Sequence, residues 1–186
     1  MIKRLARGFL RRTLGLHISR APLQAGRRVQ ASAQSIRRLV HFHQLLETVV
    51  DVDGDVVECG VGRATTFLEL LVLSSLGERK RHVYGFDTFH GLPAPSTWDD
   101  GSYDNRRLVE GALATSKDQV VDHLLRGGVP QKFIDERITL VAGYFSDTLH
   151  SYDGPGIALL HLDVDLYESY KEALEILYPR VNGGGS

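Results

Sequence analysis

The stretch Gly54–Gly62, Gly-Asp-Val-Val-Glu-Cys-Gly-Val-Gly, decides the fold expected for this chain. Its small and apolar residues before an acid are typical of a parallel strand that is covered on both faces. Gly60 and Gly62 favour a tight turn that brings a ligand close to bare backbone amides as a helix begins. Glu58 would stand at the carboxyl end of this strand, where open α/β sheets bind their ligands.

Strand and helix patterns alternate along the rest of the chain. Further strands are predicted at His82–Asp87, Ile138–Ala142 and Gly156–Asp163. Helices are predicted at Ala31–Val49, Thr65–Leu76, from an N-cap at Ser116 to Leu125, and at Ser169–Tyr178. The first helix has its predicted core stripe at Ile36, Leu39, Val40, Leu46 and Val49. This order predicts an α/β fold with a doubly wound parallel sheet, and right-handed crossovers would bring the strand ends to one edge.

Length and composition allow one domain with a substantial core. The chain has 186 residues, and no apolar run is long enough to span a membrane. Cys59 is the only cysteine, which excludes an internal disulfide framework and favours a reducing, cytoplasmic location. After residue 46 the chain has a net charge of −11, so nucleic-acid binding is not expected.

The first 46 residues contain ten Lys or Arg and no acid. Residues 1–30 are expected to form a basic helical extension with an amphipathic start. An organelle transit peptide and a surface-binding helix share this pattern, but we favour a solvated helix that packs on the domain or on a partner subunit.

The glycine turn and the next acid suggest an adenosine site. Asp87 ends the second strand at a suitable distance to accept both ribose hydroxyls. A dinucleotide fingerprint requires a third glycine where this chain has Thr65, and Glu58 would repel a pyrophosphate. The same acid suits the ammonium and sulfonium of S-adenosylmethionine, although it could instead pair with a neighbour such as Arg63.

A second group of polar residues is His161-Leu-Asp163-Val-Asp165. On an extended strand its polar side chains share one face. The two carboxylates suit Mg²⁺, or one could bind the ion while the other takes a proton from a hydroxyl group. Many sugar-nucleotide enzymes use such an Asp-x-Asp pair for metal. His161 is expected to be a core histidine with a satisfied partner rather than a ligand.

Four segments in this order resemble the macrocin-type sugar O-methyltransferases, bacterial enzymes that depend on S-adenosylmethionine and Mg²⁺ and modify deoxysugars of natural products. They are Gly54–Arg63, Tyr84–Pro93 (Tyr-Gly-Phe-Asp-Thr-Phe-His-Gly-Leu-Pro), Gly143–Leu149 (Gly-Tyr-Phe-Ser-Asp-Thr-Leu) and Leu159–Ser169 (Leu-Leu-His-Leu-Asp-Val-Asp-Leu-Tyr-Glu-Ser). The resemblance implies a Rossmann-like class I methyltransferase domain over residues 31–186. It implies a metal ligand at Asp163 and a general base at Asp165. The implied cofactor-binding residues are Glu58, Gly60, Gly62, Asp87, Phe145 and Ser146.

Two departures from the family pattern stand out. Ala64-Thr65 replaces a Gly-Gly pair, and the chain ends at Ser186, where relatives continue with a further strand and an Asp-Asp pair that completes the metal site. We therefore expect C-terminal strands to be missing, Ile157–Leu160 to form an unpaired edge, and Mg²⁺ to bind weakly.

The expected partner is a small molecule with a sugar hydroxyl, and we expect a homo-oligomer without stable membrane insertion. Two alternatives stay open. One is a metal-dependent glycosyltransferase or other sugar-nucleotide enzyme that uses Asp163 and Asp165. The other is an inactive, truncated methyltransferase fold that acts as an interaction module.

Overall fold

The computed structural model describes residues 32–186 except for residues 78, 100–101 and 104–105. Its internal contacts divide the chain into two units, residues 1–38 and residues 39–186. The predicted basic extension, residues 1–30, lies outside the described residues. In the described part of the first unit, Ser32 Oγ accepts a hydrogen bond from Ser35 N and Ser35 Oγ accepts one from Ser32 N, at 3.0 and 2.9 Å. These bonds satisfy two amides where helix α2 (Ala33–Thr48) begins.

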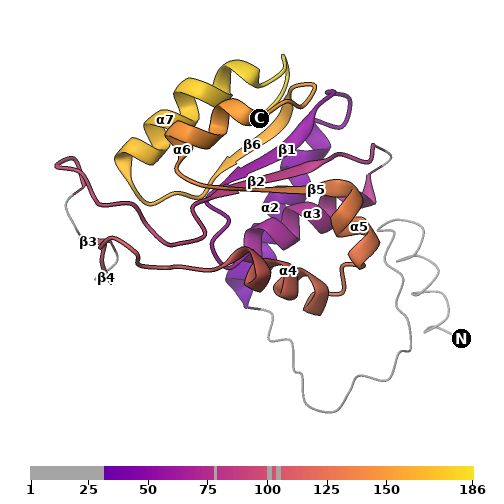
Figure 1. The fold of residues 1–186 in the computed structure, drawn as a ribbon. Coiled ribbons are helices and arrows are strands. Elements are labelled where there is room, and N and C mark those ends of the chain that lie inside the picture. The colour runs from indigo at the N-terminus through magenta and orange to yellow at the C-terminus, as the bar shows by residue number, and fades with distance from the viewer. Residues whose placement is uncertain (1–31, 78, 100–101, 104–105) are drawn as a thin grey trace, which may run out of the picture. The chain divides into compact units, whose positions relative to one another are not determined.

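The second unit is built on a four-stranded parallel sheet with the order β5-β2-β1-β6 (Figure 1). The strands are β1 (Asp55–Cys59), β2 (Val83–Asp87), β5 (Ile138–Ala142) and β6 (Ile157–Leu162). All five residues of β1 are buried, as its central position requires. The predicted parallel α/β sheet is confirmed. A separate antiparallel pair, β3 (Ser102–Tyr103) and β4 (Arg106–Arg107), follows β2 along the chain.

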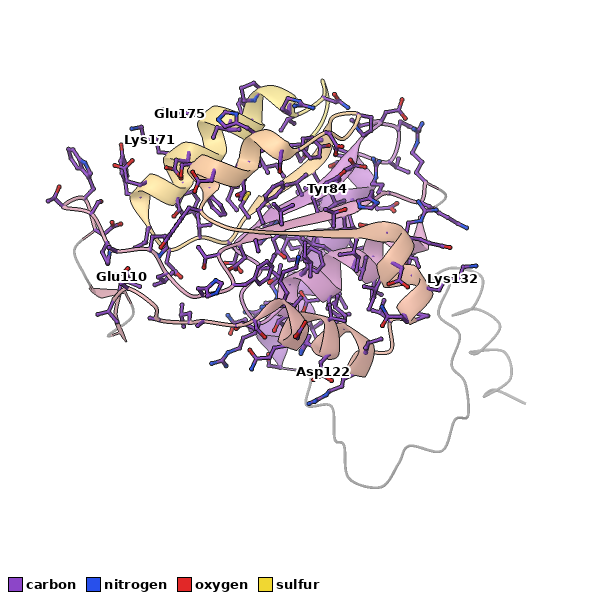
Figure 2. The ribbon with its side chains drawn as sticks, viewed as in Figure 1. Tyr84, Glu110, Asp122, Lys132, Lys171 and Glu175 are labelled. Atoms are coloured by element: carbon purple, nitrogen blue, oxygen red, sulfur yellow. The ribbon has the colours of Figure 1, made fainter. Side chains whose placement is uncertain are left out.

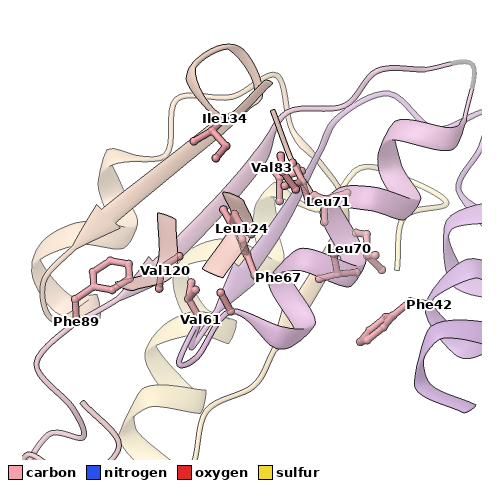
Figure 3. Packing of buried hydrophobic residues seen from close by; sticks show 14 residues of the cluster. Phe42, Val61, Phe67, Leu70, Leu71, Val83, Phe89, Val120, Leu124 and Ile134 are labelled. Carbon is pink, nitrogen blue, oxygen red and sulfur yellow. The ribbon is translucent and has the colours of Figure 1, made fainter. Parts of the chain in front are cut away.

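Helices cover both faces of this sheet. The larger apolar cluster joins one face to the end of α2 and to three further helices (Figure 3). These are α3 (Thr65–Leu76), α4 (Lys117–Arg126) and α5 (Gln131–Arg137). The second cluster joins the other face to α6 (Phe145–Thr148), η1 (Leu149–Ser151) and α7 (Tyr167–Leu177). None of the helices in the described part of the chain has the length and apolar character needed to cross a bilayer.

Helix boundaries follow local chemistry. Ser116 caps α4 through a reciprocal capping box with Gln119, as its position in the sequence suggested. On α7, Ala173 and Leu177 are buried against the sheet, whereas the exposed Lys171 and Glu175 are one turn apart on the helix (Figure 2).

The prediction of an unpaired edge at Ile157–Leu160 is wrong. Ser186 N donates a hydrogen bond to Ala158 O at 3.0 Å, and Leu160 N donates one to Ser186 O at 2.7 Å. After α7 and the 3₁₀ helix η2 (Tyr178–Arg180), Val181 forms a parallel bridge with Ile157. The glycine-rich end of the chain therefore pairs with β6 through its backbone.

The predicted core stripe of α2 is only partly correct. Ile36, Leu39 and Val40 are exposed, whereas Phe42 and Val49 are buried. Only the second half of the helix contributes to the larger apolar cluster, so the apolar periodicity extends further along the helix than the buried surface does.

Candidate functional site

The glycine turn after β1 is shaped by two glycines with different roles. Gly60 has a φ of +88°, and a Cβ atom there would lie 2.1 Å from Asp163 O, because the end of β6 runs directly against it. Gly62 has a φ of +49°, yet a Cβ atom there would meet nothing within 4 Å. Gly60 is thus required by the packing of the chain, whereas Gly62 leaves open space above its backbone for a ligand.

Ala64 adopts the same left-handed backbone region at the start of α3, with φ 60° and ψ 20°. This conformation costs a residue with a Cβ atom of the order of 1–2 kcal/mol. Glycine would adopt this backbone conformation without strain, so Ala64 holds the turn at a cost that a glycine would not have. The left-handed backbone of Ala64 is not apparent from its residue type, since alanine rarely adopts it.

Glu58 is the most unusual side chain of the site. It is fully buried on β1, and its Oε1 atom lies 3.1 Å from His161 Nδ1 on the neighbouring strand. Its Oε2 atom is buried and accepts no hydrogen bond from any described residue. Burial raises the pKa of Glu58 to about 7, with the charges of Asp163 and Asp87 adding to this effect and His161 opposing it. A buried acceptor without a donor is costly unless a ligand supplies one.

Glu58 has His161 as its partner and not Arg63, the neighbour that the sequence suggested as an alternative. Arg63 is exposed, whereas the parallel register of β1 and β6 places His161 directly beside Glu58. The His161 ring also packs edge-on against Phe42, with ring centroids 5.0 Å apart. His161 is thus a half-buried histidine whose Nδ1 has a partner, so the predicted partner is present although the residue is not fully in the core. The partner can be identified only from the register of the two strands, because the residue pattern of one strand does not show which residue lies beside it.

Asp87 joins the end of β2 to the glycine turn. Its Oδ2 accepts a hydrogen bond from Gly62 N at 2.9 Å, and its Oδ1 accepts one from Phe89 N at 2.8 Å. An ionised carboxylate has about four acceptor positions, so each oxygen keeps capacity for a ligand hydroxyl. Asp87 can therefore hold the turn and bind a diol at the same time.

The turn after β5 lies beside the end of β2, since Gly143 N donates a hydrogen bond to Asp87 O at 3.0 Å. Phe145 is buried in the second apolar cluster, so its side chain serves the core and only its backbone is available to a ligand. Ser146 is exposed, and its Oγ lies 3.4 Å from Asp147 Oδ1.

Asp163 and Asp165 follow the end of β6 rather than lying within it. Asp163 N donates a hydrogen bond to Cys59 O at 2.9 Å, which continues the ladder towards the glycine turn. Both side chains are exposed. Partial burial and the neighbouring Asp163 charge raise the pKa of Asp165. Within the described residues, no three or more His, Cys, Asp or Glu side chains are grouped so that they could hold a metal ion. The two aspartates are therefore at most part of a metal site.

Comparison with known proteins gives a consistent group of relatives. The sequence profile of the macrocin-O-methyltransferase (TylF) family matches residues 24–186. The chain is 35% identical over 155 residues to the 8-demethyl-8-(2,3-dimethoxy-alpha-L-rhamnosyl)-tetracenomycin-C 4'-O-methyltransferase of Streptomyces olivaceus, a match that covers 81% of this chain and 58% of that protein. It is 33% identical over 157 residues to the demethyldecarbamoylnovobiocin O-methyltransferase of Streptomyces niveus, with the same coverage. The chain thus spans little more than half the length of these relatives.

Solved structures agree in fold. The calicheamicin methyltransferase CalS11 superposes with a TM-score of 0.70 at 26% identity, over 83% of this chain and 63% of that one. The O-methyltransferase NovP superposes with a TM-score of 0.62 at 32% identity, over 78% of this chain and 61% of that one.

Proposed function

The chain belongs to the macrocin-O-methyltransferase (TylF) family, and we propose that it transfers a methyl group from S-adenosylmethionine to a sugar hydroxyl of a natural product. The observation that carries this proposal is the buried Glu58 carboxylate, whose Oε2 has no donor among the described residues. The ammonium group of S-adenosylmethionine is such a donor, and a carboxylate forms its stronger hydrogen bonds with charged donors. The rhamnosyl group in the name of the Streptomyces olivaceus relative supports a deoxysugar as the acceptor.

We assign the cofactor to residues 31–186, along the edge where β1, β2 and β5 end. Glu58 binds the amino-acid portion, and Asp87 accepts the ribose hydroxyls with the capacity left by its bonds to Gly62 and Phe89. Gly60 lets the turn pack against the end of β6, and Gly62 has no side chain that would keep the cofactor away from the backbone. Because the Phe145 side chain is in the core, the Phe145–Ser146 turn contributes its backbone and the exposed Ser146 hydroxyl.

The bound cofactor supplies an electrophilic methyl group on its sulfonium. The protein aligns the acceptor hydroxyl with that methyl group, and alignment of reactants contributes several kcal/mol to lowering a barrier. Asp165 accepts the hydroxyl proton as the oxygen–methyl bond forms and the sulfur–methyl bond breaks. Its raised pKa supports this assignment, because a general base works best when its pKa approaches the operating pH.

We also propose that Asp163 contributes a ligand to an assisting Mg²⁺ ion. The described residues fit such an ion only in part, since they offer no group of three suitable side chains. Mg²⁺ held by one or two carboxylates keeps several waters, so we expect weak binding and assign no step to the ion. A magnesium titration monitored by calorimetry tests this assignment.

A transfer assay tests the function. The chain is incubated with S-adenosylmethionine and a panel of deoxysugar glycosides that includes methyl α-L-rhamnopyranoside, and products are analysed by mass spectrometry. A methylated sugar together with S-adenosylhomocysteine is expected. Cofactor binding without any methylated product would instead favour the inactive interaction module. Family membership leaves the glycosyltransferase alternative without support. We retain the homo-oligomer as a proposal, which light scattering tests.

A further inference from the structure

An exposed aromatic pair lies where α7 begins. The rings of Trp98 and Tyr167 have their centroids 5.7 Å apart and are tilted by 36°. Trp98 is 73% exposed and Tyr167 is 49% exposed, so the pair covers little of the protein's own core. Exposed aromatic surface gains none of the free energy that burial would provide, so a role in packing alone does not explain this pair.

Hydrogen bonds through Asp99 fix the position of this pair. Asp99 Oδ1 accepts a bond from Tyr167 N at 2.8 Å, which ties the loop to the first residue of α7. Asp99 Oδ2 accepts bonds from both the backbone and the hydroxyl of Ser96, each at 2.8 Å. Trp98 N in turn donates to Ser96 Oγ at 3.2 Å. The indole is therefore presented by a closed turn that is attached to α7.

The aromatic pair is close in the sequence to the proposed general base. Tyr167 follows Asp165 by two residues, and the buried Leu166 between them anchors the chain. The charged residues within two positions of either aromatic residue in the sequence, Asp99, Asp100, Asp165 and Glu168, are all acidic. They disfavour a phosphate at this surface and leave a neutral ligand as the better match.

We propose that Trp98 and Tyr167 form an aromatic platform that binds the apolar face of the acceptor sugar and directs its hydroxyl towards Asp165. This inference rests on the proposed function. The C–H groups of a pyranose carry a small positive charge, and the face of an aromatic ring is negative, so the two surfaces attract each other. A deoxysugar presents more apolar surface than a fully hydroxylated sugar. The hydroxyl groups on the opposite edge remain available to the aspartates.

Trp98 is the only tryptophan of the chain, so its fluorescence reports on the platform without any turnover. With tryptophan excited selectively and S-adenosylhomocysteine present, titration with methyl α-L-rhamnopyranoside is expected to shift the emission of Trp98 saturably. Glycerol at equal concentration serves as the control and should not do so. Tyr167→Ala should weaken the sugar affinity about fivefold, whereas Tyr167→Phe should keep it, because the interaction depends on the ring face.

Tyr178→Ala is the matched control, since Tyr178 is also an exposed tyrosine, 65% exposed, but lies on η2 at the other end of α7. It should leave the titration unchanged. Calorimetry with S-adenosylhomocysteine separates the two levels of the argument. If the homocysteine nucleoside binds but Trp98 does not respond to the sugar, the platform is refuted and the proposed function stands. An equal response in wild type and Tyr167→Ala would also refute the platform. If the nucleoside does not bind, the proposed function itself fails.

Discussion

Glu58 and His161 face each other across β1 and β6, with Glu58 Oε1 3.1 Å from His161 Nδ1, and this contact uses only one oxygen of the buried carboxylate. The other oxygen has no donor among the described residues. A fold that buries an acid in this way loses stability in the free protein. This loss of stability has a purpose if the acid binds a ligand. Replacing Glu58 is therefore expected to stabilise the free protein and to weaken ligand binding.

Substitution of Glu58 should change how stability depends on pH. The pKa of Glu58 is raised from 4.5 in its ordinary state to about 7 in the folded protein. Between these values the folded state keeps a proton that the unfolded state has lost, so this group's contribution to stability falls as pH rises. The loss is on the order of 3 kcal/mol and is complete above the folded pKa.

Urea denaturation of wild type and Glu58→Gln across pH 4 to 8, a range chosen to bracket the two pKa values, measures this effect. The free energy of unfolding of the variant, relative to wild type, should increase by about 3 kcal/mol across that range. A difference that does not vary with pH would mean that the pKa of Glu58 is the same in the folded and unfolded states, and would contradict the raised pKa.

The two glycines of the turn should respond differently to alanine. Gly60→Ala places a Cβ atom 2.1 Å from Asp163 O in a left-handed backbone, and we expect it to destabilise the fold by about 3 kcal/mol or more. Gly62→Ala meets open space, so only its left-handed backbone costs stability, about 1–2 kcal/mol. Its methyl group should instead reduce the affinity for S-adenosylhomocysteine. Denaturation and calorimetry on both variants check this contrast, and equal stability losses would contradict it.

Asp165→Asn should abolish methyl transfer while leaving the affinity for S-adenosylhomocysteine within about twofold of wild type. The reason is that a general base contributes roughly 10²–10⁴-fold to the rate and does not hold the cofactor. Single-turnover transfer and calorimetry measure the two quantities on the same preparation. Parallel loss of both would assign Asp165 to cofactor binding instead.

Much of the sheet was predictable from sequence because its signals are local. The apolar run before Glu58 and the glycine turn after it lie within nine residues. Ser116 and Gln119, three residues apart, likewise mark the start of α4. Helix α5 has only seven residues, too few for an apolar period to be recognised. The pairing of Ser186 with β6 uses only backbone groups, which no side-chain pattern records.

The positions of the predicted site residues on the sheet could be read from the sequence, but their contacts could not, and their roles in binding and catalysis stay predictions. Glu58 and Asp87 were expected at one sheet edge, and the structure places them near the ends of the paired strands β1 and β2, with Gly62 N bonded to Asp87. The contact of Glu58 with His161 depends on the register of two strands that are about 100 residues apart in the sequence. The same register leaves Glu58 Oε2 without a hydrogen-bond donor among the described residues. The burial of Phe145 depends on the helices that cover the second face. The Glu58–His161 contact and the burial of Phe145 both arise from tertiary packing, which the sequence of one segment does not reveal.

Calorimetric titration of wild type and Glu58→Gln with S-adenosylhomocysteine, with NAD as the control ligand, tests the central claim most directly. The account predicts that wild type binds the homocysteine nucleoside and not NAD, and that Glu58→Gln remains folded but binds it at least about tenfold more weakly, since a charged hydrogen bond contributes about 1.5–3 kcal/mol. Equal affinity in the two proteins, or selective binding of NAD, would contradict it.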